Sequence, residues 1–194
     1  MFTELIDEGY ACLRRGDPEA ALNRFQKAAA AEPQRPQAHF GMAMAYLDQQ
    51  SNEGAMRALE TALDLDPHYV PARAYLGIEL FKRYDLDGAQ EALEQALQDE
   101  PTNLLAHIKY AEYYYRLGFY HRTVELLEQG LGKPHGANEH IVQMARTFLT
   151  EARQKRKGII LREPPDPRRL LHIFDRLRPA LSRRKQAEAR GKLR

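Results

Sequence analysis

The chain contains a single cysteine, Cys12, among its 194 residues. One thiol cannot form an internal disulfide, so the fold does not depend on an oxidising compartment. No stretch approaches the roughly 20 apolar residues that a transmembrane helix needs. The first residues also lack the basic region and the apolar run of a signal peptide. We therefore expect a soluble protein of the cytoplasm.

Sequence motifs that carry enzyme chemistry are also missing. There is no glycine-rich phosphate-binding loop and no Gly-x-Ser-x-Gly nucleophile motif. The seven histidines do not combine with cysteine or carboxylate at metal-ligand spacing, so we expect them at surface or partly buried positions. Cys12 is expected to be a small core residue and not a nucleophile. We predict no catalytic residue, no metal site and no cofactor, and hence a protein that is not an enzyme.

The charges are distributed unevenly, although the net charge is only +2. Residues 1–150 contain 14 basic and 22 acidic side chains, which gives a net charge of −8. Residues 151–194 contain 15 basic and 5 acidic side chains, which gives +10. Because 43% of the residues are hydrophobic, the chain can build a core. The sequence therefore predicts a folded acidic body followed by a basic segment.

A pattern of small and large apolar residues recurs every 34 positions. Each copy has an alanine, a large apolar residue four positions later, a second alanine and then a proline. The three complete copies are Ala21, Phe25, Ala28 and Pro33; Ala55, Leu59, Ala62 and Pro67; and Ala89, Leu93, Ala96 and Pro101. A degenerate fourth copy consists of Thr123, Leu127, Gly130 and Pro134. An upstream set of small residues with the same spacing consists of Gly9, Ala43, Gly77 and Ala111.

These spacings indicate pairs of closely packed helices. Residues four apart share one helical face, and small side chains recur where two helix backbones approach each other. The prolines at the end of each copy stop the second helix of a pair. Pro36 and Pro71 suit the first turn of the next helix, and Asp17 suits an N-cap. We predict eight helices in four pairs, followed by a ninth from about residue 137 to 157.

The pattern resembles the tetratricopeptide repeat (TPR) family, whose 34-residue unit is a pair of antiparallel helices. The resemblance covers about residues 2–157 and implies an all-α fold, a right-handed α-solenoid. The repeats implied are about 2–35, 36–69, 70–103 and 104–137, with a capping helix over 138–157. The large aromatic residue often found near the start of the first helix is absent, so less burial is expected there. The residues in its place are Leu5, His39, Arg73 and His107.

The resemblance also implies a binding surface, because in this family the first helix of each pair lines a concave groove. The peptide-binding residues expected from the phase of the repeats are Ile6, Tyr10, Leu13, Phe40, Met44, Leu47, Ile78, Phe81, Ile108, Glu112 and Tyr115. The same row includes Ala74 and continues through Val142, Arg146 and Leu149. Some of these residues could instead pack between helices.

Some members of the family grip the C-terminal carboxylate of chaperones with Lys and Asn in this groove. Ile6 and Tyr10 stand where such a clamp would begin, so we do not expect a clamp here. We expect an adaptor or scaffold that binds a protein or peptide partner, either as an amphipathic helix or as an extended segment.

After residue 157 the repeat pattern ends. Residues 158–166 are expected to be an extended linker, because residues before proline avoid the helical region. Residues 167–194 are expected to form a basic amphipathic segment. Its apolar stripe, a candidate docking segment, consists of Leu170, Phe174, Leu177 and Leu181.

Three arrangements of the basic segment are open. It could dock in the groove of its own chain or of a neighbour, which would give self-association. It could instead pack near the C-terminal end of the repeats, or it could be disordered. An alternative function also rests on it, that of a tether to nucleic acid or to an anionic membrane.

Overall fold

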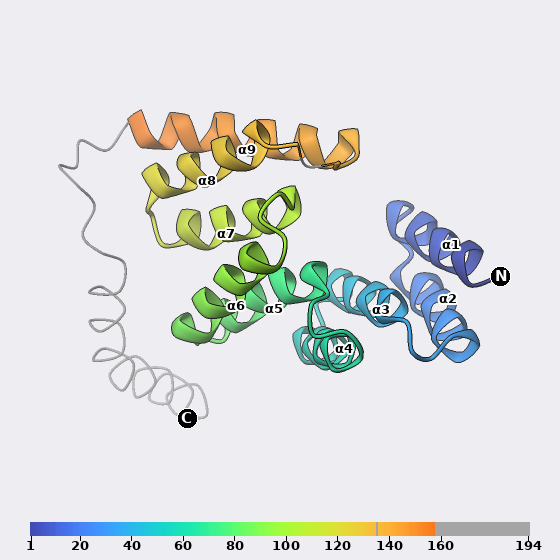
Figure 1. Ribbon diagram of the computed structural model, residues 1–194. Helices are drawn as coiled ribbons and strands as arrows, with labels where there is room; N and C mark the ends of the chain where they lie inside the picture. The colour runs from blue at the N-terminus through green and yellow to red at the C-terminus, as the bar shows by residue number, and fades with distance from the viewer. Residues whose placement is uncertain (135, 158–194) are drawn as a thin grey trace, which may run out of the picture. The chain divides into compact units, whose positions relative to one another are not determined.

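The computed structural model describes residues 1–134 and 136–157, and its secondary structure in these ranges is entirely helical (Figure 1). The helices are α1 (Phe2–Arg14), α2 (Pro18–Ala31), α3 (Pro36–Asp48), α4 (Asn52–Leu65), α5 (Val70–Lys82), α6 (Leu86–Asp99), α7 (Leu104–Arg116), α8 (Tyr120–Gly132) and α9 (Glu139–Lys157). The chain divides into two units, Met1–Arg156 and Lys157–Arg194. The expected linker at 158–166 and the expected C-terminal helix lie outside the described residues.

The helices pack in the order in which they follow along the chain. α1 packs on α2, α3 on α4, α5 on α6 and α7 on α8, which gives the four expected pairs. Each pair contacts the next through α2–α3, α4–α5 and α6–α7, and first helices also meet in the contacts α1–α3 and α5–α7. This stacking of neighbouring helix pairs, visible in Figure 1, confirms an all-α solenoid.

The 34-residue pattern builds the contacts within and between the pairs. Phe25 of α2 is fully buried, and its ring lies where a Cβ atom on Gly9 would come within 2.5 Å. The same ring faces Gly41 of α3, so one side chain joins the first pair to the second. In the third pair, a Cβ atom on Gly77 would lie 2.6 Å from Leu93. The small residues are therefore required by the close approach of large ones on the neighbouring helix.

The helix ends follow the predicted signals. The Asp17 carboxylate accepts a hydrogen bond from the Ala20 amide at 3.0 Å and caps α2. Pro36 and Pro71 lie in the first turns of α3 and α5, where their missing N–H groups leave no helical hydrogen bond unmade.

The turns between the two helices of each pair share one backbone feature. A residue with positive φ occurs at the same repeat position each time. These residues are Gly16 (φ 75°), Gln50 (φ 59°), Tyr84 (φ 66°) and Gly118 (φ 84°). Only the first and the fourth turns use glycine, which adopts this conformation without steric cost.

The last helix, α9, covers the fourth pair (Figure 1). One cluster of buried side chains joins α9 to α7 and α8. Its members are Val142, Ala145, Leu149 and Ala152 of α9 with Leu104, Ile108, Ala111, Val124 and Leu127. An ion pair between Arg153 of α9 and Glu128 of α8, at 2.8 Å, lies at the edge of this contact. The apolar side chains of α9 therefore close the fourth pair.

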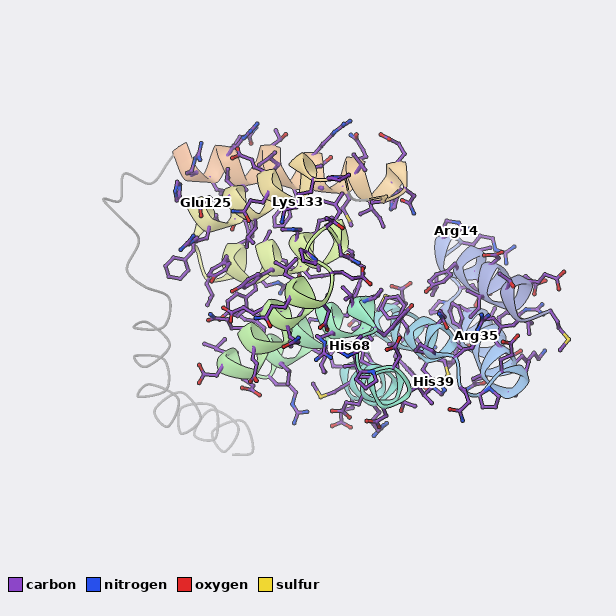
Figure 2. The ribbon with its side chains drawn as sticks, in the orientation of Figure 1. Arg14, Arg35, His39, His68, Glu125 and Lys133 are labelled. Carbon is purple, nitrogen blue, oxygen red and sulfur yellow. The ribbon has the colours of Figure 1, made fainter. Side chains whose placement is uncertain are left out.

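Cys12 and His107, which were not expected to act as a nucleophile or a metal ligand, are both buried. Cys12 is 4% exposed, which confirms its predicted place in the core. His107 is 2% exposed, so the expectation of a surface or partly buried histidine was wrong at this position. The reason is a polar contact inside the fold, because its Nε2 atom lies 3.1 Å from the Pro101 carbonyl. Lys133, which Figure 2 labels, follows the end of α8 and donates to the same carbonyl at 3.0 Å.

Candidate functional site: the first-helix row

The residues expected to bind a peptide fall at matching positions of α1, α3, α5 and α7, and we call them the first-helix row. Eight of them are half-buried: Ile6, Tyr10, Leu13, Met44, Leu47, Phe81, Glu112 and Tyr115. The others are buried in the core, namely Phe40, Ile78 and Ile108. The half-buried members are the ones whose side chains are open to a partner, and the buried members hold them in place.

The additional positions assigned to the row divide in the same way. Ala74, Val142 and Leu149 are buried, whereas Arg146 is exposed. The expected docking segment, Leu170, Phe174, Leu177 and Leu181, lies outside the described residues.

An aromatic cluster forms the part of the row near α1, α3 and α5. The Phe40 ring makes edge-to-face contacts with Tyr69 and Tyr75, at centroid distances of 5.7 and 5.5 Å. Tyr10 of α1 contacts Phe25 at 5.2 Å, and its phenol is close enough to those of Tyr69 and Tyr75 to perturb its ionisation. Side chains from three repeats therefore gather at one place.

Sequence reasoning missed two members of this cluster. Tyr69 precedes α5 as its N-cap residue, and Tyr75 follows the row position Ala74 directly. The phase of the repeats selected Ala74, whose side chain is fully buried. The available signal for Tyr75 was that it stands next to Ala74, which is assigned to the row, whereas no such signal marked Tyr69.

The tyrosine hydroxyl groups of the cluster are not used inside the fold. Within the part of the chain that the structure describes, Tyr10, Tyr69 and Tyr75 make no hydrogen bond through their hydroxyl groups. Burial raises the pKa of Tyr10, and the neighbouring phenols of Tyr69 and Tyr75 raise it further. Burial and the nearby carboxylates of Asp66 and Glu100 raise the pKa of Tyr69 to about 12. Tyr10 and Tyr69 are therefore protonated at neutral pH and able to donate.

The charged part of the row lies on α7. Lys109 Nζ lies 3.0 Å from one oxygen of Glu112, and Arg116 donates to the other oxygen at 2.6 and 2.9 Å. Burial alone would raise the pKa of Glu112, but Lys109 and Arg116 outweigh it and lower that pKa. The Lys109 ammonium also lies over the Tyr75 ring, 4.1 Å from its centroid. Lys109 therefore connects this charged group to the aromatic cluster. The two cations and one carboxylate together have a net charge of +1.

The row extends from α7 to α9 through aromatic contacts. The Tyr115 ring lies 5.2 Å from Phe148 of α9 and 5.1 Å from Tyr120 of α8, both edge to face. The Tyr115 hydroxyl donates to Glu151 of α9. The half-buried side chains of the first helices α1, α3, α5 and α7 are therefore continued by Phe148 of α9.

Two other kinds of site were sought among the described residues. Residues 1–134 and 136–157 contain no group of three His, Cys, Asp or Glu side chains placed to hold a metal ion. Among the helices α1 to α9, none has the length and hydropathy needed to cross a membrane.

Stacked helix pairs with a row of half-buried apolar and aromatic side chains on the first helices define a helical-repeat protein. Models of the tetratricopeptide repeat family match residues 6–70 and 80–139. The chain belongs to the tetratricopeptide repeat family. Proteins of this family are generally protein-interaction scaffolds. No curated protein sequence matches the chain.

Solved structures show the same fold at low sequence identity. The chain is similar to TTC0263, a TPR protein of Thermus thermophilus, with a TM-score of 0.64, 20% identity and coverage of 90% of this chain and 96% of that one. It is similar to a chain of the APC/C hetero-tetramer Cut9–Hcn1, with a TM-score of 0.68, 18% identity and 81% of this chain covered. The chain spans only 31% of that relative's length.

A third similar structure was solved with a bound peptide. The first TPR domain of Spaghetti (RPAP3), bound to the HSP90 peptide SRMEEVD, has a TM-score of 0.53 and 23% identity, and the match covers 60% of this chain and 92% of that one. At these identities the likeness concerns the fold.

Proposed function

We propose that the chain is an adaptor or scaffold that binds a protein partner along the first-helix row, as an amphipathic helix or an extended peptide. The observation that carries this proposal is the run of half-buried apolar and aromatic side chains on α1, α3, α5 and α7, continued to α9 by Tyr115 and Phe148. The family supports the same role, since TPR proteins are generally interaction scaffolds. We place this role in the cytoplasm, because a chain with one cysteine forms no internal disulfide and so needs no oxidising compartment.

The packing of the row makes it suited to binding. Leu13 packs against the cluster around Phe25, and Met44 packs against the cluster around Leu59. Each side chain is therefore held on one side by the core and open on the other. Because little side-chain freedom remains to be lost, a partner that covers this surface gains apolar burial at a low entropic cost.

The test begins with a peptide-display selection on the full-length chain. Peptides that bind are then measured against a variant with Leu13→Gln, Met44→Gln and Leu47→Gln. A matched control carries Leu22→Gln, Leu63→Gln and Leu97→Gln, which are also half-buried but lie on the second helices α2, α4 and α6. Circular dichroism shows whether each variant keeps its helices.

We expect the first variant to lose the selected peptides and the control to keep them. A loss of about 1 kcal/mol per altered side chain amounts to more than a hundredfold in Kd for the three together. Peptides that bind the first variant as tightly as the parent would place the binding surface elsewhere.

The basic segment is a proposed regulator of this binding, on sequence grounds alone. Its apolar stripe and its net charge of +10 over residues 151–194 complement an apolar row on an acidic body. If it competes with peptides, Phe174→Ser together with Leu177→Ser in the full chain should increase peptide affinity. Unchanged affinity would show that the segment does not regulate peptide binding.

A second candidate function also rests on this segment, namely a tether to nucleic acid or to an anionic membrane. The observation that favours it is the same charge of +10. Such binding would weaken steeply as salt increases, because basic side chains release counterions from a polyanion. If the chain binds neither DNA nor phosphatidylserine vesicles at low salt, this second function is excluded.

A further inference from the structure

The aromatic cluster of Tyr10, Phe40, Tyr69 and Tyr75 has hydrogen-bond donors without partners. The hydroxyl groups of Tyr10, Tyr69 and Tyr75 form no hydrogen bond within the described part of the chain. They come from α1, from the N-cap of α5 and from α5 itself, and each side chain is half-buried. A half-buried hydroxyl group gains from a partner that supplies an acceptor.

The carboxylate that shares Lys109 with Tyr75 is already engaged. Both oxygens of Glu112 accept from the cations of Lys109 and Arg116. The cations beside Tyr75 therefore leave Glu112 little capacity to accept from a ligand.

The carboxylates close to Tyr69 each have one oxygen engaged. Asp66 accepts from the His68 amide at 3.0 Å, and Glu100 accepts from the Asn103 side chain at 2.7 Å. A ligand that offers carbonyl groups would find hydrogen-bond donors in the three hydroxyl groups.

The aromatic rings supply the apolar part of the surface. Phe40 meets Tyr69 and Tyr75 at interplanar angles of 76° and 68°, so the rings stand nearly perpendicular to one another. These edge-to-face contacts fix the half-buried Tyr69 and Tyr75 rings around the buried Phe40, and the exposed parts of the two tyrosine rings can pack against an apolar group. Lys109 covers one face of Tyr75, and this leaves the donors and the remaining ring surfaces to the ligand.

We propose that this aromatic cluster binds a proline-rich extended segment of a partner protein. In the polyproline II conformation the backbone carbonyl groups have no internal hydrogen bond, and proline has no N–H to satisfy. Tyrosine hydroxyl groups can donate to those carbonyls while the rings pack on the pyrrolidine rings. The inference rests on the proposed function, since it names the partner class for the same row.

Other peptide conformations fit the cluster less well. A helical ligand has its carbonyl groups bonded within the helix, so it offers few acceptors to the three hydroxyl groups. An extended segment without proline brings one N–H per residue, and each of these groups needs an acceptor of its own.

The test measures binding of a labelled peptide of about ten prolines, roughly 31 Å long at 3.1 Å per residue. A glycine–serine peptide of equal length is the control ligand. The full-length chain is compared with a variant carrying Tyr10→Phe, Tyr69→Phe and Tyr75→Phe, which keeps every ring and removes the three donors. Tyr46→Phe is the control variant, because Tyr46 is also half-buried on a first helix and its ring packs against α4 at Gly54.

We expect the parent to bind the proline peptide and not the glycine–serine peptide. The triple variant should bind it about tenfold more weakly or worse, and Tyr46→Phe should change Kd by less than about twofold. An equal Kd for the parent and the triple variant would overturn the inference. So would a failure of the parent to bind the proline peptide.

The same measurements separate this inference from the proposed function. If display-selected peptides bind the row while the proline peptide does not, the inference fails and the function stands. The chain's own Pro164, Pro165 and Pro167 are another source of such a segment. The three prolines are therefore replaced by alanine in a further variant. If this variant binds the proline peptide more tightly than the parent, the cluster binds the chain's own segment, and the assignment to a partner is wrong.

Discussion

At the scale of single residues, the fold depends on small side chains placed opposite large ones. Sequence spacing alone identified both members of these contacts, because a 34-residue period places them at the same point of every pair. Gly9 opposite Phe25 and Gly77 opposite Leu93 show why the period is kept. Any atom added at the glycine must displace a fully buried side chain.

Gly77→Leu is expected to lower the free energy of unfolding by about 1–3 kcal/mol through overpacking. The measurement is the denaturant midpoint of the full chain. Gly132→Leu is the control, because Gly132 lies at the end of α8 with no atom within 4 Å of a Cβ placed there. If Gly77→Leu and the parent unfold at the same midpoint, the packing described for α5 and α6 is wrong.

His107 shows where sequence reasoning at this scale fails. Its repeat position is held by residues as different as Leu5, His39 and Arg73, so the period says nothing about its burial. The burial depends on one carbonyl, that of Pro101, and on the missing side chain of Gly130, where a Cβ atom would lie 2.8 Å from that of His107. Neither can be read from one sequence.

His107 predicts a dependence of stability on pH. Burial, together with the nearby Lys133, lowers the pKa of His107 below its ordinary 6.5, against the raising effect of the Pro101 carbonyl. The neutral ring is thus favoured in the fold. Its contribution to stability is complete above pH 6.5 and is lost as pH falls through the lowered pKa. One such group changes the free energy of unfolding by at most about 1.4 kcal/mol per pH unit.

His107→Gln should therefore reduce the slope of stability against pH between about pH 5 and 6.5. Burial also lowers the pKa of His39, so part of the slope should remain. Glu112, whose pKa is lowered from 4.5, and Asp99, whose pKa is lowered from 3.8, lose their contributions below this window. His140→Gln, at an exposed position, is the control. An unchanged slope in His107→Gln would contradict the burial described here.

At the scale of elements, the four turns inside the helix pairs share one conformation with different residues. The sequence predicted the helices on both sides of each turn from proline, small-residue and capping signals. It did not predict that Gln50 and Tyr84 adopt positive φ, since neither residue favours that region. The repeat imposes this geometry, because the two helices of every pair must meet at the same angle for the next pair to stack.

Gln50→Gly should therefore stabilise the chain by about 0.5–1 kcal/mol, after the greater freedom of glycine in the unfolded chain is subtracted. Gln49→Gly is the matched control, because Gln49 has φ −77° and its replacement should destabilise. Thermal unfolding of the two variants beside the parent gives the comparison. Destabilisation by both substitutions would show that the turn does not hold Gln50 at positive φ.

At the scale of the whole molecule, the repeat period predicted the stack of helix pairs, and the family confirms it. The row of candidate binding residues was assigned by phase, which places a residue on a helix but not its neighbours on the next repeat. Tyr75 and Lys109 belong to different repeats and meet only because α5 packs on α7. The contact between Tyr115 and Phe148 likewise depends on how α9 packs on the fourth pair, and it could not be read from the spacing.

The central claim is that a partner binds along the first helices, and photo-crosslinking tests it most directly. A benzoyl-phenylalanine residue is placed at Met44 on α3 in one full-length variant, and at the exposed Arg57 on α4 in another. Each variant is irradiated with a peptide obtained by display selection on the parent chain. The account predicts a crosslink from position 44 and none from position 57. A crosslink from position 57, with none from position 44, would contradict it.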